Sequence, residues 1–330
     1  MRKHILFLVI TLIYLGTSCE KKLDTEFDFK PQMVVTGILI PGRDIEIRLM
    51  ANFPTNQNTA ITPIESATVS LFEGDAPMGH LTHTTGGIYT MQAQITEGKT
   101  YTLRASCNGF PPIEATTTIP TTQSIPVEKQ PSLSTKTENT QLTDNPCIRI
   151  ELPATTSVSY YGLLCYNVWE MPLADGIHKL YGVCQMEVSD KLVEFMDYSF
   201  YYRSSWDKLN DFTDMDAEQE LQTYFTDIMV GATDGYIFFL SSESYVGERY
   251  VLNLEDYGTP YLNIYQMSAE LYKSFKGIAA QRSTQNGLFV TPVPAYNCIE
   301  GGLGYFGGVL VQTVELIEPD GNFKNINNNQ

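Results

Sequence analysis

The chain has 330 residues, of which 43% are hydrophobic, so it is long enough to build two domains with ordinary apolar cores. Its 38 acidic residues outnumber its 21 basic residues and give a net charge of −17. This excess argues against binding to nucleic acid phosphates or to anionic lipid headgroups. The 20 tyrosines, 16 phenylalanines, 24 glycines and 17 prolines favour strands joined by many turns.

The N-terminal residues 1–18 are predicted to be a lipoprotein signal peptide. A short basic stretch, 1–4, precedes the apolar run 5–15, which is too short to span a bilayer. Small residues then precede Cys19, as in a lipobox, where a peptidase needs small side chains before the cut and the cysteine sulfur takes the lipid. An ordinary secretory signal with an incidental cysteine is the alternative. We expect lipidation at Cys19, and several acyl chains there would anchor the protein firmly.

The next segment, 19–30, is predicted to be a charged tether. Four acidic residues lie close behind the cysteine: Glu20, Asp24, Glu26 and Asp28. Acidic residues in this place resemble the signal that sends such lipoproteins to the cell surface.

Five further cysteines follow Cys19: Cys107, Cys147, Cys165, Cys184 and Cys298. An exported protein meets an oxidising compartment, where disulfides are permitted, and the odd number leaves at least one thiol unpaired. Their spacing does not fit a zinc site. Cys165 and Cys184 lie in strand-like runs joined by a predicted hairpin, so they are the first pair to test. Isolated buried thiols are the alternative.

The first predicted domain covers residues 31–120. Alternation of apolar and polar residues between turn signals predicts strands at 33–40, 44–50, 67–72, 88–93, 100–105 and 113–119. Short, evenly spaced strands without a helix predict an Ig-like or transthyretin-like β-sandwich. His80 and His83 lie three residues apart, which on a strand puts them on opposite faces and does not suit a shared metal.

Residues 121–145 are predicted to be a linker, because proline, serine, threonine and glutamine dominate them, and 135–145 is expected to be a loop. Residues 146–330 are predicted to form a larger antiparallel β-rich domain with one helix. Its strands are expected at 147–152, 160–170, 181–188, 234–240, 249–254, 261–267 and 309–316. Ser268 is expected to cap a helix over 269–281.

The segment 192–225 is the least strand-like part of the chain and is rich in aromatic residues. Tyr201, Tyr202 and Trp206 are the candidate ligand-binding residues, because such rings stack on sugars or flat apolar ligands. A core beneath a long loop is the alternative. The acidic run 211–220 lacks the spacing and the glycine of a calcium-binding loop.

No catalytic motif is evident. The sequence contains neither a G-x-S-x-G elbow nor an H-E-x-x-H helix, and only three histidines follow the signal: His80, His83 and His178. We therefore expect no enzyme, no cofactor and no metal site. A pair of carboxylates across a cleft, as in glycosidases, stays open because acidic residues are plentiful.

Residues 296–308 contain the densest glycine run of the chain: Gly301, Gly302, Gly304, Gly307 and Gly308. The spacing is not that of a phosphate-binding loop, and no helix is expected after it. We expect a tight buried loop that leads into a closing strand of the second domain.

The same stretch carries a family resemblance, on Asn297, Ile299, Glu300, Gly302, Leu303, Gly304, Phe306 and Gly307. It resembles a large family of Bacteroidota outer-membrane lipoproteins of unknown function. That family pairs a carboxypeptidase-regulatory-like β-domain with a β-rich C-terminal domain and is often encoded beside TonB-dependent receptors.

The resemblance implies a lipid-anchored outer-membrane protein that faces the cell exterior. It implies an accessory role in ligand capture with a TonB-dependent receptor barrel, for a small-molecule, glycan or peptide ligand. A scaffold or adhesion lipoprotein is the alternative, and a carboxylate-dependent hydrolase is a third hypothesis.

Overall fold

The computed structural model describes residues 29–53, 62–136, 142–152, 158–173, 176–183, 185–188, 238–241, 249–253, 259–284, 296–316 and 324–326. The chain divides into two compact units, 1–31 and 32–330, and the strands and the helix described here lie in the second. The described residues are mainly strands, with one helix, α3 (Ala269–Thr284). The predicted mainly-β fold class is therefore confirmed.

Eight strands lie in the N-terminal part: β1 (Met33–Leu39), β2 (Ile45–Ala51), β3 (Thr62–Pro63), β4 (Thr68–Glu73), β5 (Ala76–His83), β6 (Ile88–Met91), β7 (Thr100–Ser106) and β8 (Ile113–Thr118). All six strands predicted here are present. Burial alternates along β1, β2 and β7, as expected for strands with one face in a core. Strand β5, which holds both histidines, was not predicted as a strand.

Ten strands lie in the C-terminal part: β9 (Val127–Lys136), β10 (Leu142–Ile150), β11 (Tyr160–Leu173), β12 (Gly176–Val183), β13 (Gln185–Val188), β14 (Phe238–Ser241), β15 (Arg249–Asn253), β16 (Thr259–Met267), β17 (Leu303–Glu315) and β18 (Lys324–Ile326). Strands β13, β15, β10 and β9 form a separate four-stranded sheet in that order. The predicted loop at 135–145 is wrong at both ends, where β9 and β10 pair with each other. Mostly polar residues there leave no apolar period to reveal the strands.

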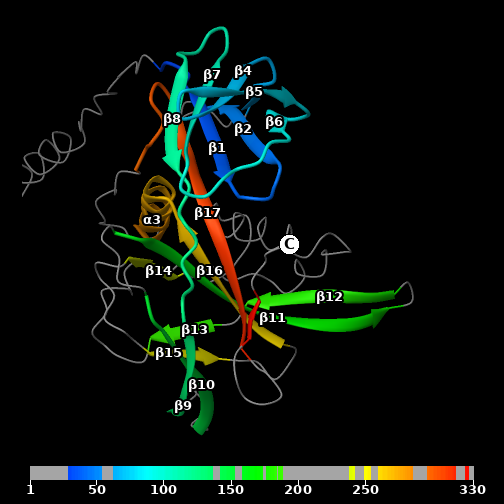
Figure 1. Cartoon of the computed structure of the whole chain (residues 1–330), viewed down its shortest axis with the longest axis vertical. Helices are drawn as coiled ribbons and strands as arrows, with labels where there is room; N and C mark the ends of the chain where they lie inside the picture. Colours follow the sequence, from blue (N-terminus) through cyan, green and yellow to red (C-terminus); the bar gives the residue numbers. More distant parts are fainter. Residues whose placement is uncertain are drawn as a thin grey trace, which may run out of the picture. The chain divides into compact units, whose positions relative to one another are not determined.

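Strand β17 joins the two parts of the chain. Its first half pairs in parallel with β1, from Val34 opposite Leu303 to Leu39 opposite Gly308. Its second half pairs antiparallel with β16. One sheet therefore runs in the order β12-β11-β16-β17-β1-β2-β6-β5-β4-β7-β8, and Figure 1 shows β17 beside both β1 and β16. The predicted domains 31–120, 121–145 and 146–330 stay predictions, and this one sheet contains strands from both the first and the third of them.

The start of β17 corrects one prediction. The closing strand was expected over 309–316, with the glycines in a loop before it. Instead the strand begins at Leu303, so Gly304, Gly307 and Gly308 lie within it. Glycine weakens a strand in general. Here only glycine fits, because at each of these positions a neighbouring atom occupies the place that a Cβ would take.

Strand β17 also divides its side chains between two cores. Phe306, together with Ile299 just before the strand, belongs to the N-terminal core, which includes Val35, Ile47 and Leu71. Tyr305 and Val309 belong to a second core beneath α3, with Leu164 and Phe275. A third core lies between β11, β16 and the four-stranded sheet, and contains Ile148, Ile150, Leu163 and Leu262.

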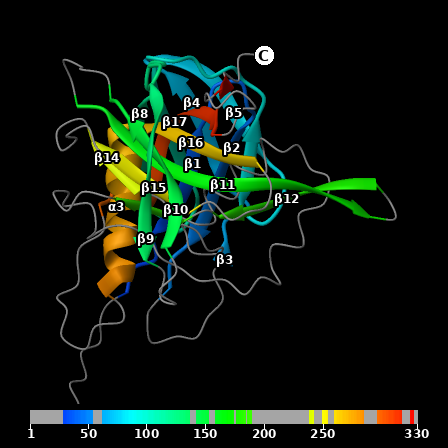
Figure 2. The same cartoon turned by 90° about the horizontal axis from the view of Figure 1, so that it is seen from below.

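Helix α3 begins where the sequence predicts. The Ser268 hydroxyl accepts a hydrogen bond from the Leu271 backbone N–H (3.4 Å), as an N-cap does. It also accepts one from the Gly308 N–H of β17 (3.2 Å), so the cap ties the helix to the sheet. Leu271 and Phe275 are fully buried, so they form the apolar face by which the helix packs on the sheet. Figure 2 shows the helix lying beside the sheet.

The beginning of the predicted linker forms hydrogen bonds with both the N-terminal part of the chain and β17. The Glu97 carboxylate accepts hydrogen bonds from the Thr122 backbone N–H (2.7 Å) and hydroxyl (2.6 Å). Further along, the Gln312 amide of β17 accepts from the Ile125 N–H (3.0 Å) and donates to the Ile125 carbonyl (2.9 Å). The Gln312 side chain thus makes the two bonds that a neighbouring strand would make.

Candidate functional site

The residues that the sequence singles out as sites lie outside the described part of the chain. This holds for the predicted lipidation site, Cys19, and for the predicted ligand-binding residues Tyr201, Tyr202 and Trp206. Cys184 is outside as well, so its pairing with Cys165 stays a prediction. The described strands β11 and β12 pair in register as far as Tyr166 opposite Val183, one residue short of each cysteine.

The glycine junction, which we define as residues 297–308, is held tightly against neighbouring backbone. Gly301 and Gly304 have φ angles of 75° and 113°, which favour glycine. A Cβ added at Gly304 would collide with the backbone of Val35, and one at Gly301 with the carbonyl oxygen of Pro112. At Gly302 it would lie 2.7 Å from the Met33 carbonyl oxygen. These glycines therefore let β17 and its preceding turn approach neighbouring backbone directly.

The geometry of the junction does not fit a phosphate cradle. Such a cradle points backbone N–H groups at the anion, whereas the atoms that face these three glycines include carbonyl oxygens. The backbone N–H groups of Glu114 and Glu300 are taken by each other's carbonyls, at 3.1 and 2.8 Å. The Asn297 amide donates to the carbonyls of Ile299 (3.1 Å) and Gly302 (2.9 Å). The structural interpretation of the glycine run is thus supported.

Cys298, inside the junction, is a poor nucleophile. Its thiol donates to the Phe306 carbonyl (3.7 Å) and lies 4.0 Å from the Ser274 hydroxyl. Burial raises the pKa of the Cys298 thiol, so the protonated form prevails. This thiol packs against the N-terminal core, and the described groups that perturb its pKa include the Glu270 carboxylate, whose charge disfavours the thiolate that a catalytic cysteine needs.

A buried polar network, absent from the sequence predictions, crosses the sheet under α3. Its hub is Asn263 of β16, which is 1% exposed. The Asn263 carbonyl oxygen accepts from the hydroxyls of Thr313 (2.9 Å) and Tyr166 (3.3 Å), and its amide donates to the Tyr265 hydroxyl (3.0 Å). Only the register of β11, β16 and β17 brings these four residues together, so no short sequence motif reveals them.

The tyrosines around this network are held in the neutral form. Burial raises the pKa of Tyr265, and burial also raises that of Tyr261, with a further contribution from the Glu315 carboxylate. The rings of Tyr166 and Tyr261 stack with centroids 5.6 Å apart. Phenols of this kind do not supply protons near neutral pH, so the cluster is suited to packing and hydrogen bonding, not to acid–base chemistry.

The pKa of Tyr272, on α3, allows the effect of burial on these tyrosines to be tested. Burial raises its pKa to about 12, and Tyr160, whose ring centroid is 4.6 Å away, adds to the rise. The unfolded chain has the ordinary value of about 10, so above that pH the unfolded state loses its proton first. The contribution of Tyr272 to stability is therefore expected to be constant below about pH 10 and to be lost as the pH rises towards about 12.

The replacement Tyr272→Phe is expected to flatten this decline. Urea midpoints measured from about pH 8 to pH 12 would show it. The matched control is Tyr296→Phe, at an exposed ring, which should leave the decline as in the original protein. An equal alkaline decline in the Tyr272→Phe protein would contradict the assignment to Tyr272.

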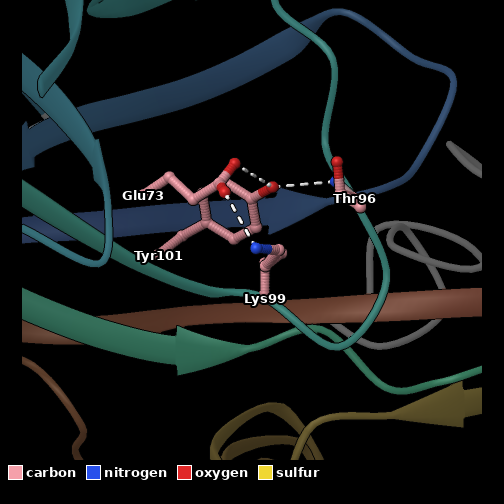
Figure 3. Close-up of polar contacts among 4 residues, drawn as sticks. All are labelled: Glu73, Thr96, Lys99 and Tyr101. Atoms are coloured by element: carbon pink, nitrogen blue, oxygen red, sulfur yellow. Dashed lines mark hydrogen bonds and ion pairs between the residues drawn. The ribbon is translucent and has the colours of Figure 1, made fainter. Parts of the chain in front are cut away.

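A second tyrosine, Tyr101 of β7, organises the corner before that strand (Figure 3). Its fully buried hydroxyl accepts from the Thr96 backbone N–H (2.8 Å) and donates to the Glu73 carboxylate (3.3 Å). Lys99 lies 3.6 Å from the same carboxylate. A tyrosine that bonds the backbone a few residues upstream is the tyrosine corner of Ig-like sandwiches. The cluster is therefore structural.

The exposed side of β5, β4, β7 and β8 is a polar face, which we define by four cross-strand pairs. They are Ser70–His80 (2.9 Å), Thr100–Thr118 (2.9 Å), Thr102–Thr116 (3.0 Å) and Arg104–Glu114 (2.7 Å). Arg104 also lies 4.7 Å from the centre of the Phe72 ring. These side chains bond one another across the strands, so the face presents paired hydroxyls and one ion pair to solvent.

Within the described ranges, no group of three or more histidine, cysteine or acidic residues is placed to hold a metal ion. His80 bonds Ser70, while the His83 ring packs against Tyr89 with centroids 5.2 Å apart. The same ranges contain no helix that is long and apolar enough to cross a membrane.

A family model described as "Domain of unknown function (DUF4249)" matches residues 20–315. No curated protein matches the chain. A solved structure described as a membrane-anchored protein from Corynebacterium diphtheriae is similar at 13% identity and a TM-score of 0.19, over 72% of this chain and 54% of that one. The chain thus spans about half the length of that protein, and at so low a TM-score nothing further follows from the likeness.

Proposed function

This chain belongs to the DUF4249 family, and we propose that it is an outer-membrane lipoprotein that captures a ligand for a TonB-dependent receptor. The observation that carries the proposal is Cys19, which follows small residues directly after an apolar run of export length. Lipid on this sulfur would hold the β-rich body at the membrane, facing the cell exterior. The protein acts by binding and has no catalytic activity of its own.

Three further observations support this proposal. The net charge of −17 suits a body that stays hydrated beside the membrane. The aromatic segment with Tyr201, Tyr202 and Trp206 offers ring surfaces for a small-molecule, glycan or peptide ligand. The half-buried phenol of Tyr261, the buried phenol of Tyr265 and the thiol of Cys298 have raised pKa values, which favours packing over catalysis at these positions.

The test is lipid attachment and co-purification from native membranes. The original protein is expected to carry the mass of a lipidated N-terminal cysteine and to stay in the outer-membrane fraction. Cys19→Ala should lose both, while Cys107→Ala, which removes a half-buried cysteine of the body, should lose neither. A receptor barrel identified by mass spectrometry beside the original protein supports the accessory role. An unmodified Cys19 overturns the proposal.

The polar face favours a second function, a scaffold or adhesion lipoprotein. Its paired threonines and its Arg104–Glu114 ion pair present a broad surface of alternating donors and acceptors, which suits contact with a flat protein partner. Co-purification separates the two functions. A lipidated protein that consistently lacks a receptor barrel, and that crosslinks to a partner through β7 and β8, supports the scaffold.

A further inference from the structure

Asn108 and Gly109 form the tip of the turn between β7 and β8. Both residues are exposed, and a backbone hydrogen bond from the Phe110 N–H to the Cys107 carbonyl (3.2 Å) closes the turn. Gly109 has a φ of 88°, and a Cβ there would meet nothing within 4 Å. The tip is therefore open to solvent, as is usual for a turn built from small polar residues.

The side chain of Asn108 and the nitrogen that follows it are both unbonded. Among the residues that the structure describes, neither the Asn108 side-chain amide nor the Gly109 backbone N–H makes a hydrogen bond. The Asn108 backbone carbonyl accepts from the Cys107 thiol (3.8 Å), which leaves the side chain free to change rotamer. Glycine has no side chain, so it leaves the approach of its own nitrogen to the Asn108 amide unhindered.

Other described asparagines lack this combination. The Asn297 amide donates to two backbone carbonyls of its own loop, and a cysteine follows it. The Asn52 side-chain carbonyl accepts from the Gln32 N–H (2.7 Å), and a phenylalanine follows it. Asn263 is buried within its network. Because their amides are held in place, Asn52 and Asn297 serve as internal references for the reactivity of Asn108.

We propose that Asn108 is a site of spontaneous deamidation in the folded protein. The Gly109 nitrogen loses its proton to base and attacks the side-chain carbonyl carbon of Asn108. A new carbon–nitrogen bond forms, the bond to the side-chain nitrogen breaks, and that nitrogen takes a proton from water and leaves as ammonia. Water then opens the cyclic imide at either of its carbonyl carbons. One opening gives aspartate, and the other gives isoaspartate, in which the chain runs through the former side chain.

The modification adds a negative charge to the turn and leaves the strands paired. Strands β7 and β8 pair from Thr100 opposite Thr118 to Ala105 opposite Ile113, so their pairing ends before the turn on both sides. The extra backbone atom of isoaspartate therefore falls in the turn, and the protein is expected to stay folded as the acid accumulates. The site goes beyond the proposed function, since it depends neither on the lipid anchor nor on a receptor.

The experiment is peptide mapping by mass spectrometry of the full chain, purified in detergent and kept folded in mildly alkaline buffer. The peptide with Asn108 is expected to gain the mass difference between an amide and an acid, with first-order kinetics, and to separate into aspartate and isoaspartate forms. The Asn108→Asp protein supplies the standard for the first form. Mildly acidic buffer should slow the reaction, because the Gly109 nitrogen then keeps its proton. Asn52 and Asn297 should react at least about tenfold more slowly, which corresponds to a barrier higher by about 1.4 kcal/mol.

Two glycine variants separate this chemistry from general effects on folding. Gly109→Ala places a methyl group beside the attacking nitrogen and should slow the conversion of Asn108 about tenfold. Gly42→Ala is the matched control, because Gly42 also has a positive φ, 83°, and open space around an added Cβ. It should leave the conversion unchanged. If Gly109→Ala does not fold, Asn108→Gln replaces it, since the longer side chain must close a larger ring and should react far more slowly.

A comparison with the unfolded chain decides whether the turn leaves Asn108 free. The same protein is incubated in guanidinium chloride, where its asparagines are no longer held by the fold. A folded rate at Asn108 within about tenfold of the unfolded rate supports the proposal, and a slower folded rate overturns it because the turn then protects the residue. Equal folded rates at Asn108, Asn52 and Asn297 would overturn it as well, since the geometry of the turn would then make no difference.

Discussion

Replacing Gly304 with alanine is expected to destabilise the protein by about 4 kcal/mol or more, since it combines backbone strain with a collision in the sheet. Gly304 has a φ of 113° and pairs with Val35 of β1. The new methyl group would collide with the Val35 carbonyl oxygen and lie 2.9 Å from the Val35 nitrogen. The backbone of a central strand cannot retreat as a flexible side chain does. Urea unfolding followed by circular dichroism measures the loss.

Gly109→Ala is the matched control. Gly109 also has a positive φ, 88°, but a Cβ there meets nothing within 4 Å. Only the backbone strain remains, so a loss of about 1–2 kcal/mol is expected. The difference between the two variants isolates the collision with β1. Equal losses would show that β1 and β17 are not packed as closely as the register places them.

Replacing Asn263 with leucine is expected to cost about 3 kcal/mol or more, because the amide serves three hydroxyl groups in a buried setting. Leucine is similar in size, so the change removes hydrogen bonds without opening a large cavity. The bonds to Thr313 and Tyr265 are 2.9 and 3.0 Å long, and both residues are buried. Thermal and urea unfolding of the variant would measure the loss.

A double-mutant cycle with Thr313→Val tests whether the network acts as a unit. Thr313→Val alone should cost about 1 kcal/mol, and combining it with Asn263→Leu should cost less than the sum of the two. Asn108→Leu, at an exposed turn residue, is the control and should change stability by no more than about 0.5 kcal/mol. Strict additivity of the two core substitutions would contradict the shared hydrogen bonds.

Local signals in the sequence were sufficient for most strands and for the helix. Alternating burial in β2 follows the polar and apolar alternation of 44–50, and the Ser268 cap fixes the start of α3 because its hydroxyl satisfies an otherwise unpaired N–H. The pairing of β1 with β17 was not predictable in this way. Periodicity tells which face of a strand is buried but does not name its partner, and the glycines of β17 resemble a loop by composition.

The candidate site residues also differ in whether local sequence or long-range strand pairing reveals them. Cys19 is a recognisable candidate because the predicted lipobox is a linear motif, and the aromatic segment is one because composition alone suggests ring stacking. Asn263 is an ordinary residue in sequence. Its role becomes visible only when strand register sets it beside Thr313. Such juxtapositions depend on long-range pairing, which no local pattern encodes.

The position of β1 has a mechanical consequence. This strand follows the predicted tether and is flanked on one side by β2 and on the other by β17, with six register pairs to the latter. An outer strand peels away one hydrogen bond at a time under tension. A pull that enters at Met33 instead loads both flanks in shear, and all of the bonds along the strand must yield together. If the chain is anchored through the predicted tether, the first strand of the body would resist mechanical unfolding more strongly than an outer strand of the sheet would.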